Sequence, residues 1–213
     1  MEMSNQFWLK VLEQERAIAV IRAHSWQQGC EMAKAVAAGG MKLIEITWNS
    51  DRPEKTISYL RHELPDCQIG TGTLLNLEQM EMAIDSGAEF LFTPHTDLSL
   101  IQAAVKANIP IIPGALSPTE IVTAWQAGAS CVKVFPIQAV GGVNYIRNLQ
   151  GPLGNIPLIP TGGVTLKNAK EFLQAGAIAV GLAGDLFPQN LITQADWQGI
   201  SRNAKKLMQQ IKD

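Results

Sequence analysis

The segment SCVKVFP, residues 130–136, places Lys133 inside an otherwise apolar run with the character of a β-strand. A lysine in apolar surroundings has the pKa of its amine lowered by desolvation, and the neutral amine can attack a ketone. The protonated imine that results is an electron sink, so it stabilises the carbanion left when a carbon–carbon bond breaks. Lys133 is therefore a candidate nucleophile for a carbon–carbon bond cleavage.

Glu45, in the run KLIEIT, is the acid that such chemistry would need. A carboxyl group beside the lysine would move protons while the imine forms, and would take the proton from the hydroxyl on the carbon that is cleaved. Glu89 is less suited, because it starts its own strand and so lies near the opposite end of the sheet. We expect Glu45 to be the general acid and base.

Each of these residues also has a purely structural interpretation. Lysines are seldom fully buried, and Lys133 on an outer face would bury its stem while its ammonium group reached water. Glu45 could be an ordinary partner in a structural ion pair, the commoner role of a carboxylate near a lysine. Thr73 and Thr161 are good strand formers and individually say little. The elements that position these residues decide between the alternatives.

From residue 17 onward, short β-branched runs alternate with stretches of helical period, which is typical of a parallel sheet. Asn76 and Ser117 are suitable N-caps, and Gly-Ala pairs recur before several strands. With no linker between them, the repeats predict an α/β fold: one (β/α)8 TIM barrel domain over residues 1–213, with an extra N-terminal helix at 1–15 and a last outer helix at 193–213. The predicted strands are 17–22, 42–47, 67–73, 89–94, 109–114, 130–136, 156–163 and 177–184.

Barrel chemistry collects at the carboxyl ends of the strands, and strand alternation indicates which side chains share a face. If the faces that carry polar residues point inward, one polar site forms at the top of the barrel. On the third strand this assignment turns Ile69 and Thr71 inward together with Thr73. The residues expected to converge are Arg22, Glu45, Thr73, Lys133 and Thr161.

The segment PTGGV, residues 160–164, leads from the seventh strand into a helix expected to begin near Thr165. Glycines permit close approach of the backbone, and free amides at a helix start favour an anion, although a lone GG is more often a simple turn. Gly162 and Gly163, with Gly184 after the eighth strand, therefore predict a phosphate site of the kind that this barrel places after strands seven and eight.

Composition narrows the classes of function. A net charge of -2 argues against a partner such as nucleic acid or an anionic membrane. Three widely separated cysteines suggest neither a disulfide framework nor a zinc site, which fits a cytoplasmic location, and we see no signal peptide or transmembrane run. His24 and His95 lack the spacing of metal ligands and are expected to be loop residues beside strand ends.

The motifs AVIRA, LIEIT, GTGTLLN, TPH, IPG, VKVFP and PTGGV extend over nearly the whole chain. In this order they resemble the class I aldolases that cleave 2-keto-3-deoxy-6-phosphogluconate (KDPG) and 4-hydroxy-2-oxoglutarate (KHG). The resemblance implies that Lys133 forms the Schiff base and that Glu45 is the general acid-base. It also implies substrate contacts from Arg22, Thr73, Pro94, Phe135, Thr161, Gly162, Gly163 and Gly184.

The resemblance further implies a homotrimer that needs no metal or other cofactor, binds a phosphorylated keto acid and pyruvate, and serves the Entner-Doudoroff route. Two positions depart from the pattern: Asn49 stands where some members have an arginine, and Gly184 where many have a serine. Both departures bear on substrate preference more than on reaction type.

Several alternatives stay open from the sequence. The nearest are an aldolase for the galactonate epimer and a broad pyruvate aldolase that also decarboxylates oxaloacetate. A phosphate-binding barrel isomerase would use similar seventh and eighth strands, but would not require Lys133 as a nucleophile. A non-catalytic sugar-phosphate sensor would tolerate the loss of Lys133 and Glu45, so their joint presence counts against it.

Overall fold

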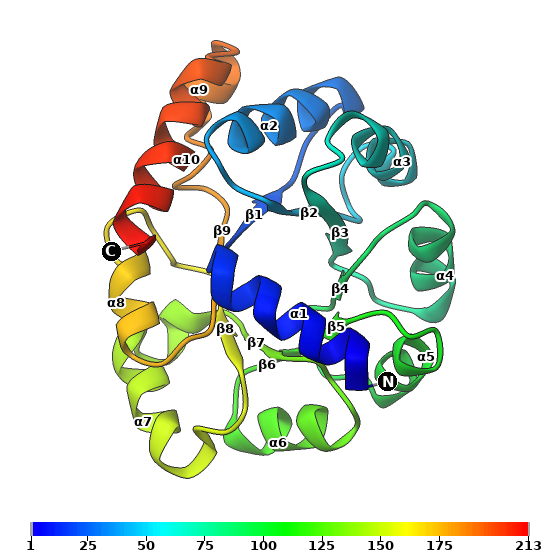
Figure 1. Cartoon of the computed structure of the whole chain (residues 1–213), viewed down its shortest axis with the longest axis vertical. Coiled ribbons are helices and arrows are strands. Elements are labelled where there is room, and N and C mark those ends of the chain that lie inside the picture. The colour runs from blue at the N-terminus through cyan, green and yellow to red at the C-terminus, as the bar shows by residue number, and fades with distance from the viewer. Residues whose placement is uncertain (1, 213) are drawn as a thin grey trace.

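The computed structural model describes the backbone of residues 2–212 and the side chains of residues 6–212. Strands gather at the centre of the molecule and helices surround them (Figure 1). The strands are β1 Ala17–Ile21, β2 Leu43–Thr47, β3 Gln68–Gly72, β4 Leu91–Phe92, β5 Ile111–Ile112, β6 Gly114–Ala115, β7 Val132–Val134, β8 Leu158–Pro160 and β9 Val180–Leu182.

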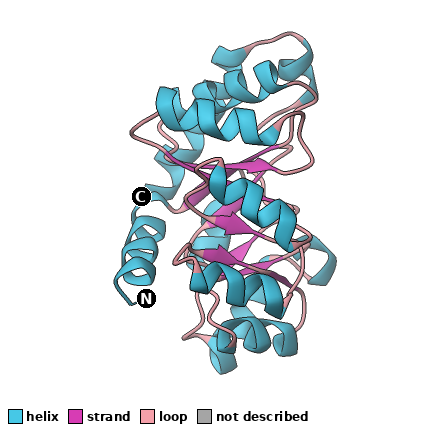
Figure 2. Cartoon of the chain, turned by 90° about the vertical axis from the view of Figure 1, so that its right-hand side faces the viewer, coloured by secondary structure: helices cyan, strands magenta, loops and turns pink. Residues whose placement is uncertain are grey.

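Except for α1, which precedes β1, the helices follow the strands along the chain and form the outer layer, as the view from the side also shows (Figure 2). They are α1 Glu2–Glu15, α2 Trp26–Ala38, α3 Pro53–Glu63, α4 Leu77–Asp85, α5 Leu98–Lys106, α6 Pro118–Gln126, the 3-10 helix η1 Ile137–Val140, α7 Val143–Leu153, α8 Ala169–Gln174, α9 Gln189–Thr193 and α10 Trp197–Lys212. No helix in the described range is long and apolar enough to span a membrane.

The strands form two parallel sheets that curl around a common interior. One sheet has the order β5-β4-β3-β2-β1-β9 and the other the order β6-β7-β8. Hydrogen bonds connect the two: the Ser130 amide, just before β7, donates to the Ile111 carbonyl of β5 at 2.9 Å, and the Ile178 amide donates to the Leu158 carbonyl at 3.1 Å. The predicted α/β alternation is thus confirmed as a curled parallel sheet.

The predicted fifth strand is divided into β5 and β6 by Pro113. Proline has no amide hydrogen to donate to a ladder, so the strand is interrupted there, and the chain then pairs with β7 instead of β4. This break is where one sheet ends and the other begins.

The predicted caps are confirmed. The Asn76 side chain accepts a hydrogen bond from the Gln79 amide at 2.9 Å, and Ser117 forms a capping box with Glu120. After these helices, Gly87 and Gly128 have φ values of 92° and 102°, in the left-handed region that glycine adopts without steric cost.

The helix expected to begin near Thr165 begins later, at Ala169. The Thr165 amide donates to the Asn168 side chain and the Leu166 amide to the Asp185 side chain, both at 2.7 Å. Side-chain acceptors of this kind compete with helical hydrogen bonds and hold residues 165–168 as a turn. The prediction of a helix start near Thr165 was therefore wrong.

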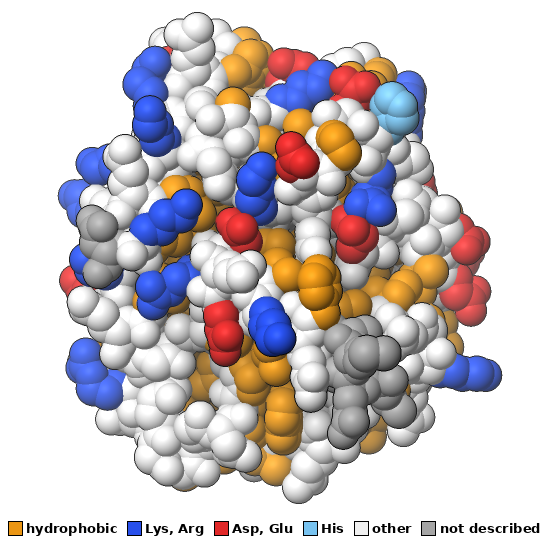
Figure 3. Space-filling model, viewed as in Figure 1, with side chains coloured by type: hydrophobic (Ala, Val, Ile, Leu, Met, Phe, Trp, Pro, Cys, Tyr) orange, Lys and Arg blue, Asp and Glu red, His pale blue; other side chains and the backbone are white. Residues whose placement is uncertain are grey.

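The interior of the curled sheet is a separate apolar cluster from the layer between sheet and helices. Helix α1 crosses the ring of strands (Figure 1) and contributes Trp8 and Leu12 to this inner cluster. Trp8 packs against Phe90 with 4.9 Å between ring centroids. On the face that α1 crosses, acidic, basic and apolar side chains are interspersed (Figure 3).

The inner faces predicted for four strands are confirmed, because Ile18, Leu43, Cys131 and Ile159 all belong to the inner cluster. On β3 the predicted face was wrong. Ile69 packs in the outer cluster.

Thr71 also lies outside, since its hydroxyl donates to the Ile46 carbonyl at 2.7 Å. The inner positions of β3 are Gly70 and Gly72. A Cβ at Gly70 would overlap the Phe90 ring, and one at Gly72 would overlap the Glu45 carboxylate. The inward face of β3 therefore has no room for side chains at positions 70 and 72, and we call this face bare.

We expect Gly70→Ala to lower the free energy of unfolding by about 1–3 kcal/mol, because the added methyl group overpacks the interior against Phe90. Chemical denaturation measures the change. Gly151→Ala is the control: a Cβ at Gly151 meets no atom within 4 Å, and because Gly151 lies inside α7, alanine should stabilise the fold by up to about 1 kcal/mol. Equal effects of the two substitutions would contradict the packing argument.

Candidate active site

Two ionisable side chains are buried in the same interior. Among the described side chains, Glu45 of β2 and Lys133 of β7 are the only buried members of the Asp, Glu, Lys and Arg group, with 1% and 5% of their surface exposed. Both stand on inner faces, as the sequence predicts. Their burial contradicts the alternative in which the Lys133 head group reaches water from an outer face.

Lys133 is fixed by the strands on both sides of it. It pairs in register with Gly114 of β6 and with Ile159 of β8. Its Nζ lies 4.9 Å from the centroid of the Phe135 ring and 5.6 Å from that of Phe92. The amine is therefore bounded by aromatic faces, which can hold a cation and which keep bulk water away from a neutral amine.

Glu45 lies between Val20 of β1 and Gly70 of β3 in the register of the sheet. Burial raises the pKa of its carboxyl group, while the positive charges of Lys133 and Arg22 lower it in part. Its Oε1 is buried and has no hydrogen-bond partner, and no ion pair joins Glu45 to Lys133 among the described residues. The carboxyl group can thus exchange protons closer to neutral pH than an ordinary glutamate can.

Thr161 supplies a second buried polar atom without a partner. It follows β8, forms a bridge with Gly181, and has 6% of its surface exposed. Its Oγ1 makes no hydrogen bond to the described residues. Buried polar groups are ordinarily satisfied, so the unpaired oxygens of Glu45 and Thr161 mark the interior as a place that can receive a polar ligand.

The loops after β8 and β9 lie next to one another. The hydrogen bond from Leu166 to Asp185 connects them. Gly162 and Gly163 have φ values of 82° and 102°, in the left-handed region. Phe135 packs against Gly162 and thereby links this loop to the lysine strand.

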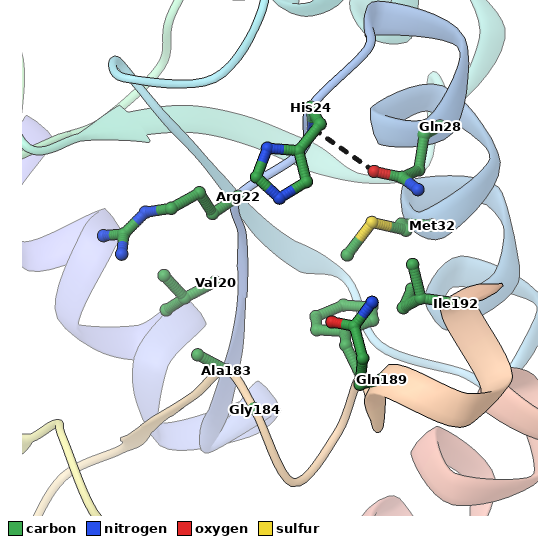
Figure 4. Close-up of a pocket in the computed structure, with 10 residues that line it drawn as sticks. Val20, Arg22, His24, Gln28, Met32, Ala183, Gly184, Gln189 and Ile192 are labelled. Atoms are coloured by element: carbon green, nitrogen blue, oxygen red, sulfur yellow. Dashed lines mark hydrogen bonds between the residues drawn. The ribbon is translucent and has the colours of Figure 1, made fainter.

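Gly184 is open on its side-chain side, with no atom within 4 Å of the position of a Cβ. It lines a pocket of about 230 Å³ that Arg22 also lines (Figure 4). Arg22 is exposed, and its Nε donates to Asn49 Oδ1 at 3.2 Å. Asn49, one of the two departures from the expected pattern, thus contacts the arginine that the family resemblance assigns to substrate binding.

Other residues predicted to contact the substrate, and the two histidines near strand ends, lie around the buried pair. Thr73 is half-buried just after β3 with a φ of 64°, and the alternation argument that turned it inward does not hold. The Pro94 backbone packs directly against Gly114, the register partner of Lys133, and a Cβ at Gly114 would overlap it. His95 lies near Asp97 with 3.9 Å between Nε2 and Oδ2, whereas His24 lines the pocket beside Arg22.

Sequence reasoning missed three residues that shape the site. Phe92 flanks the lysine, Gly72 leaves room for Glu45, and the Gln138 side chain packs against Gly163. The spacing of two glycines in GTG indicated a bare strand face and could have revealed Gly72. In the described part of the chain no cluster of His, Cys, Asp and Glu could hold a metal ion.

Comparison with known proteins gives the family. Residues 9–203 match the model of the family described as KDPG and KHG aldolase. The chain belongs to the KDPG and KHG aldolase family. It is therefore an aldolase, and so a lyase. A 2-dehydro-3-deoxy-phosphogluconate aldolase of Haemophilus influenzae is 32% identical over the full length of both chains. A KHG/KDPG aldolase of Escherichia coli is 28% identical over 90% of each chain.

Solved structures of the aldolase family have the same fold. A KDPG aldolase from Legionella pneumophila, with pyruvate captured as a covalent carbinolamine intermediate, superposes with a TM-score of 0.86 at 28% identity and covers 92% of this chain and 96% of that one. A native KDPGal structure gives a TM-score of 0.82 at 29% identity, with the same coverage. A 3-hexulose-6-phosphate synthase, at 20% identity and a TM-score of 0.72, shares the fold.

The raised pKa of Glu45 predicts a pH-dependent effect of Glu45→Gln on stability. A carboxyl group whose pKa is higher in the folded state stabilises the fold below its unfolded pKa, near 4.5, and that stability is lost as the pH rises through the folded pKa. Wild type should therefore lose stability relative to Glu45→Gln as the pH rises above about 4.5.

Urea unfolding at several pH values measures the difference. The exposed Glu81→Gln is the control, and its difference from wild type should change little over the same range. A Glu45→Gln variant whose advantage shrinks as the pH rises would contradict the assignment of a raised pKa.

Proposed function

We propose that the chain is a class I aldolase that cleaves KDPG to pyruvate and glyceraldehyde 3-phosphate through a Schiff base on Lys133. The observation that carries this proposal is the burial of a lysine and a carboxyl group, not ion-paired to one another, in one apolar interior. The carbinolamine captured in the Legionella enzyme supports the same chemistry here.

The proposed reaction uses the two groups in turn. The Lys133 amine attacks the C2 ketone of the keto acid, and loss of water from the carbinolamine gives an iminium ion. Glu45 takes the proton from the C4 hydroxyl, the C3–C4 bond breaks, and its electron pair moves into the iminium ion to form an enamine. The aldehyde leaves, Glu45 returns the proton to C3, and water releases pyruvate from Lys133.

The raised pKa of Glu45 suits this double role, because the group must both accept and donate a proton near neutral pH. We assign the unpaired Thr161 hydroxyl, with Thr73, to the pyruvoyl end of the substrate. Arg22, held by Asn49, would contact an anionic group of the substrate.

The remaining residues predicted to contact the substrate lie in the loops around Lys133. Phe135 follows β7, and its ring packs against the Lys133 amine. Pro94 packs against Gly114 of β6, the strand beside β7. We propose that Gly162, Gly163 and Gly184 receive the phosphate, supported by their left-handed or open backbone in adjoining loops.

We further propose that the two sheets close into one (β/α)8 barrel over residues 1–213, supported by the hydrogen bonds that join them. A cytoplasmic homotrimer in the Entner-Doudoroff route is proposed from the family resemblance. One solved structure contains a chain 28% identical to this one over 92% of its length. It is a protein cage designed by fusing symmetric oligomeric domains, which supports the proposal of an oligomer.

The galactonate epimer is the second candidate substrate. The asparagine at position 49 carries no positive charge, unlike the arginine of some family members. The native KDPGal structure is 29% identical to this chain, against 28% for the Legionella enzyme. Cleavage of 4-hydroxy-2-oxoglutarate and decarboxylation of oxaloacetate would proceed through the same imine. An isomerase or a sugar-phosphate sensor would leave the buried Lys133 and Glu45 unexplained.

Borohydride reduction in the presence of pyruvate should trap a stable adduct on the peptide that contains Lys133, because reduction converts the imine into a secondary amine. Mass spectrometry of the digest locates it. Lys133→Met should abolish the adduct, whereas Lys170→Met, which removes an exposed lysine of α8, should not. An unmodified Lys133, under conditions that trap a known class I aldolase, would falsify the proposal.

Glu45→Gln should reduce kcat for KDPG cleavage by about 10²–10⁴-fold, since it removes general acid-base catalysis. Trapping of added pyruvate should fall much less, because Lys133 remains. The two measurements are a coupled assay of pyruvate release and the yield of the reduced adduct. Equal losses in both would mean that Glu45 serves imine formation alone.

A further inference from the structure

Two aromatic rings flank the side-chain amine of Lys133, which forms neither a hydrogen bond nor an ion pair in the described part of the chain. A lysine side chain has many rotamers to choose from, and an amine that leaves the geometry of attack loses rate steeply. Whatever restricts this amine therefore contributes to the rate of the proposed reaction.

The two rings differ in how firmly they are held. Phe135 follows β7, is half-buried, and borders the loop at Gly162. Phe92 lies on β4, has 1% of its surface exposed, and belongs to the inner cluster. Its backbone is fixed by the register pair with Ile112 of β5. Phe92 is therefore the more rigid of the two walls beside the amine.

Behind Phe92, a stack of aromatic side chains extends to helix α1. Phe92 meets Phe90 edge-on with 5.9 Å between ring centroids, and Phe90 packs on Trp8 of α1 at 4.9 Å. Phe90 can occupy this place because Gly70 has no side chain. Close-packed interiors transmit displacements, so Phe92 cannot move away from Lys133 without disturbing the side chains that α1 places inside the sheet.

Simple packing is the alternative, since an inner position of β4 is apolar whatever the reaction. Phe172 of α8 is a residue of that kind: it is equally buried, at 1%, but lies in the outer cluster. No lysine or arginine of the described range lies over its ring. The Phe92 ring, in contrast, faces the Lys133 amine within the roughly 6 Å at which aromatic faces attract cations.

We propose that Phe92 is a positioning residue for the reaction of Lys133. Its ring, supported from behind by Phe90 and Trp8, restricts where Nζ lies when the bond between Nζ and the C2 ketone carbon forms. Phe92 itself forms and breaks no bond. The inference rests on the proposed function and adds to it a residue that acts through the lysine.

Phe92→Leu, compared with Phe172→Leu, tests this role. Both substitutions remove one fully buried ring, so the denaturant midpoint should fall by similar amounts. Phe92→Leu should lower kcat for KDPG cleavage and the rate of pyruvate trapping on Lys133 by about 10-fold, with KM changed at most about twofold. Phe172→Leu should leave both rates unchanged. If Phe92→Leu does not fold, Phe92→Met replaces it, because the flexible methionine fills irregular gaps.

Trp8→Phe tests the support from α1. It should lower the trapping rate about threefold, because Phe90 gains room to retreat from Phe92. In the Phe92→Leu background it should have no further effect, since the stack is already broken. Leu12→Ala is the control on the same helix: Leu12 lies in the inner cluster but outside the stack, so its loss should cost stability and leave the rate unchanged.

The outcomes separate this inference from the proposed function. Wild type that traps no pyruvate overturns both together. Normal trapping by wild type, with equal rates in Phe92→Leu and Phe172→Leu or with a loss that appears in KM instead of kcat, overturns the positioning role alone. Effects of Trp8→Phe and Phe92→Leu that multiply independently overturn the support from α1. A rate loss confined to Phe92→Leu at matched stability supports the positioning role.

Discussion

The fold is organised around the burial of two ionisable groups in one small apolar interior. An isolated charge in such a place costs several kcal/mol even after relaxation, and here no direct ion pair between Glu45 and Lys133 offsets it. The raised pKa of Glu45 is one response, since the group can carry a proton in place of its charge. The aromatic rings around the Lys133 amine are another.

Each of these two side chains has a glycine as one register partner: Gly70 beside Glu45, and Gly114 beside Lys133. A Cβ at Gly70 would overlap Phe90 and one at Gly114 the Pro94 backbone, so these two glycines are required by packing around the site. Gly72 meets the carboxylate itself. The Glu45 carboxylate thus occupies space that the bare face of β3 leaves open, whereas Trp8 and Leu12 of α1 fill the interior from the end that this helix crosses.

The sequence was sufficient for features with local causes. Alternation of runs predicted the parallel sheet, and Asn76 and Ser117 predicted helix starts, because a cap depends on hydrogen bonds within four residues. The inner position of Lys133 followed from the assumption that the strand faces that carry polar residues point inward. The face of β3 was misassigned because threonine polarity was taken as the guide, while the crowding that forces glycine inward comes from Phe90 and Glu45 on neighbouring strands.

The turn at residues 165–168 could not be predicted for a related reason. One of its acceptors is Asp185, which belongs to a loop 19 residues further along the chain. Similarly, the contact between Arg22 and Asn49 joins residues 27 positions apart. Such contacts depend on the closed arrangement of the strands, which sequence patterns indicate only as a class of fold.

The division between interior and rim also explains how reaction and substrate range can vary separately. Glu45 and Lys133 are buried, and changing either alters groups in a low-dielectric interior that many packing contacts hold in place. Arg22, Asn49 and Gly184 lie exposed at the rim, where Gly184 has open space beside it. Substitutions at the rim disturb little of the core, so they can change which part of a substrate is held without changing the bond that is broken. The rim is therefore the part of the structure where substitutions can change substrate range at the least cost to the fold.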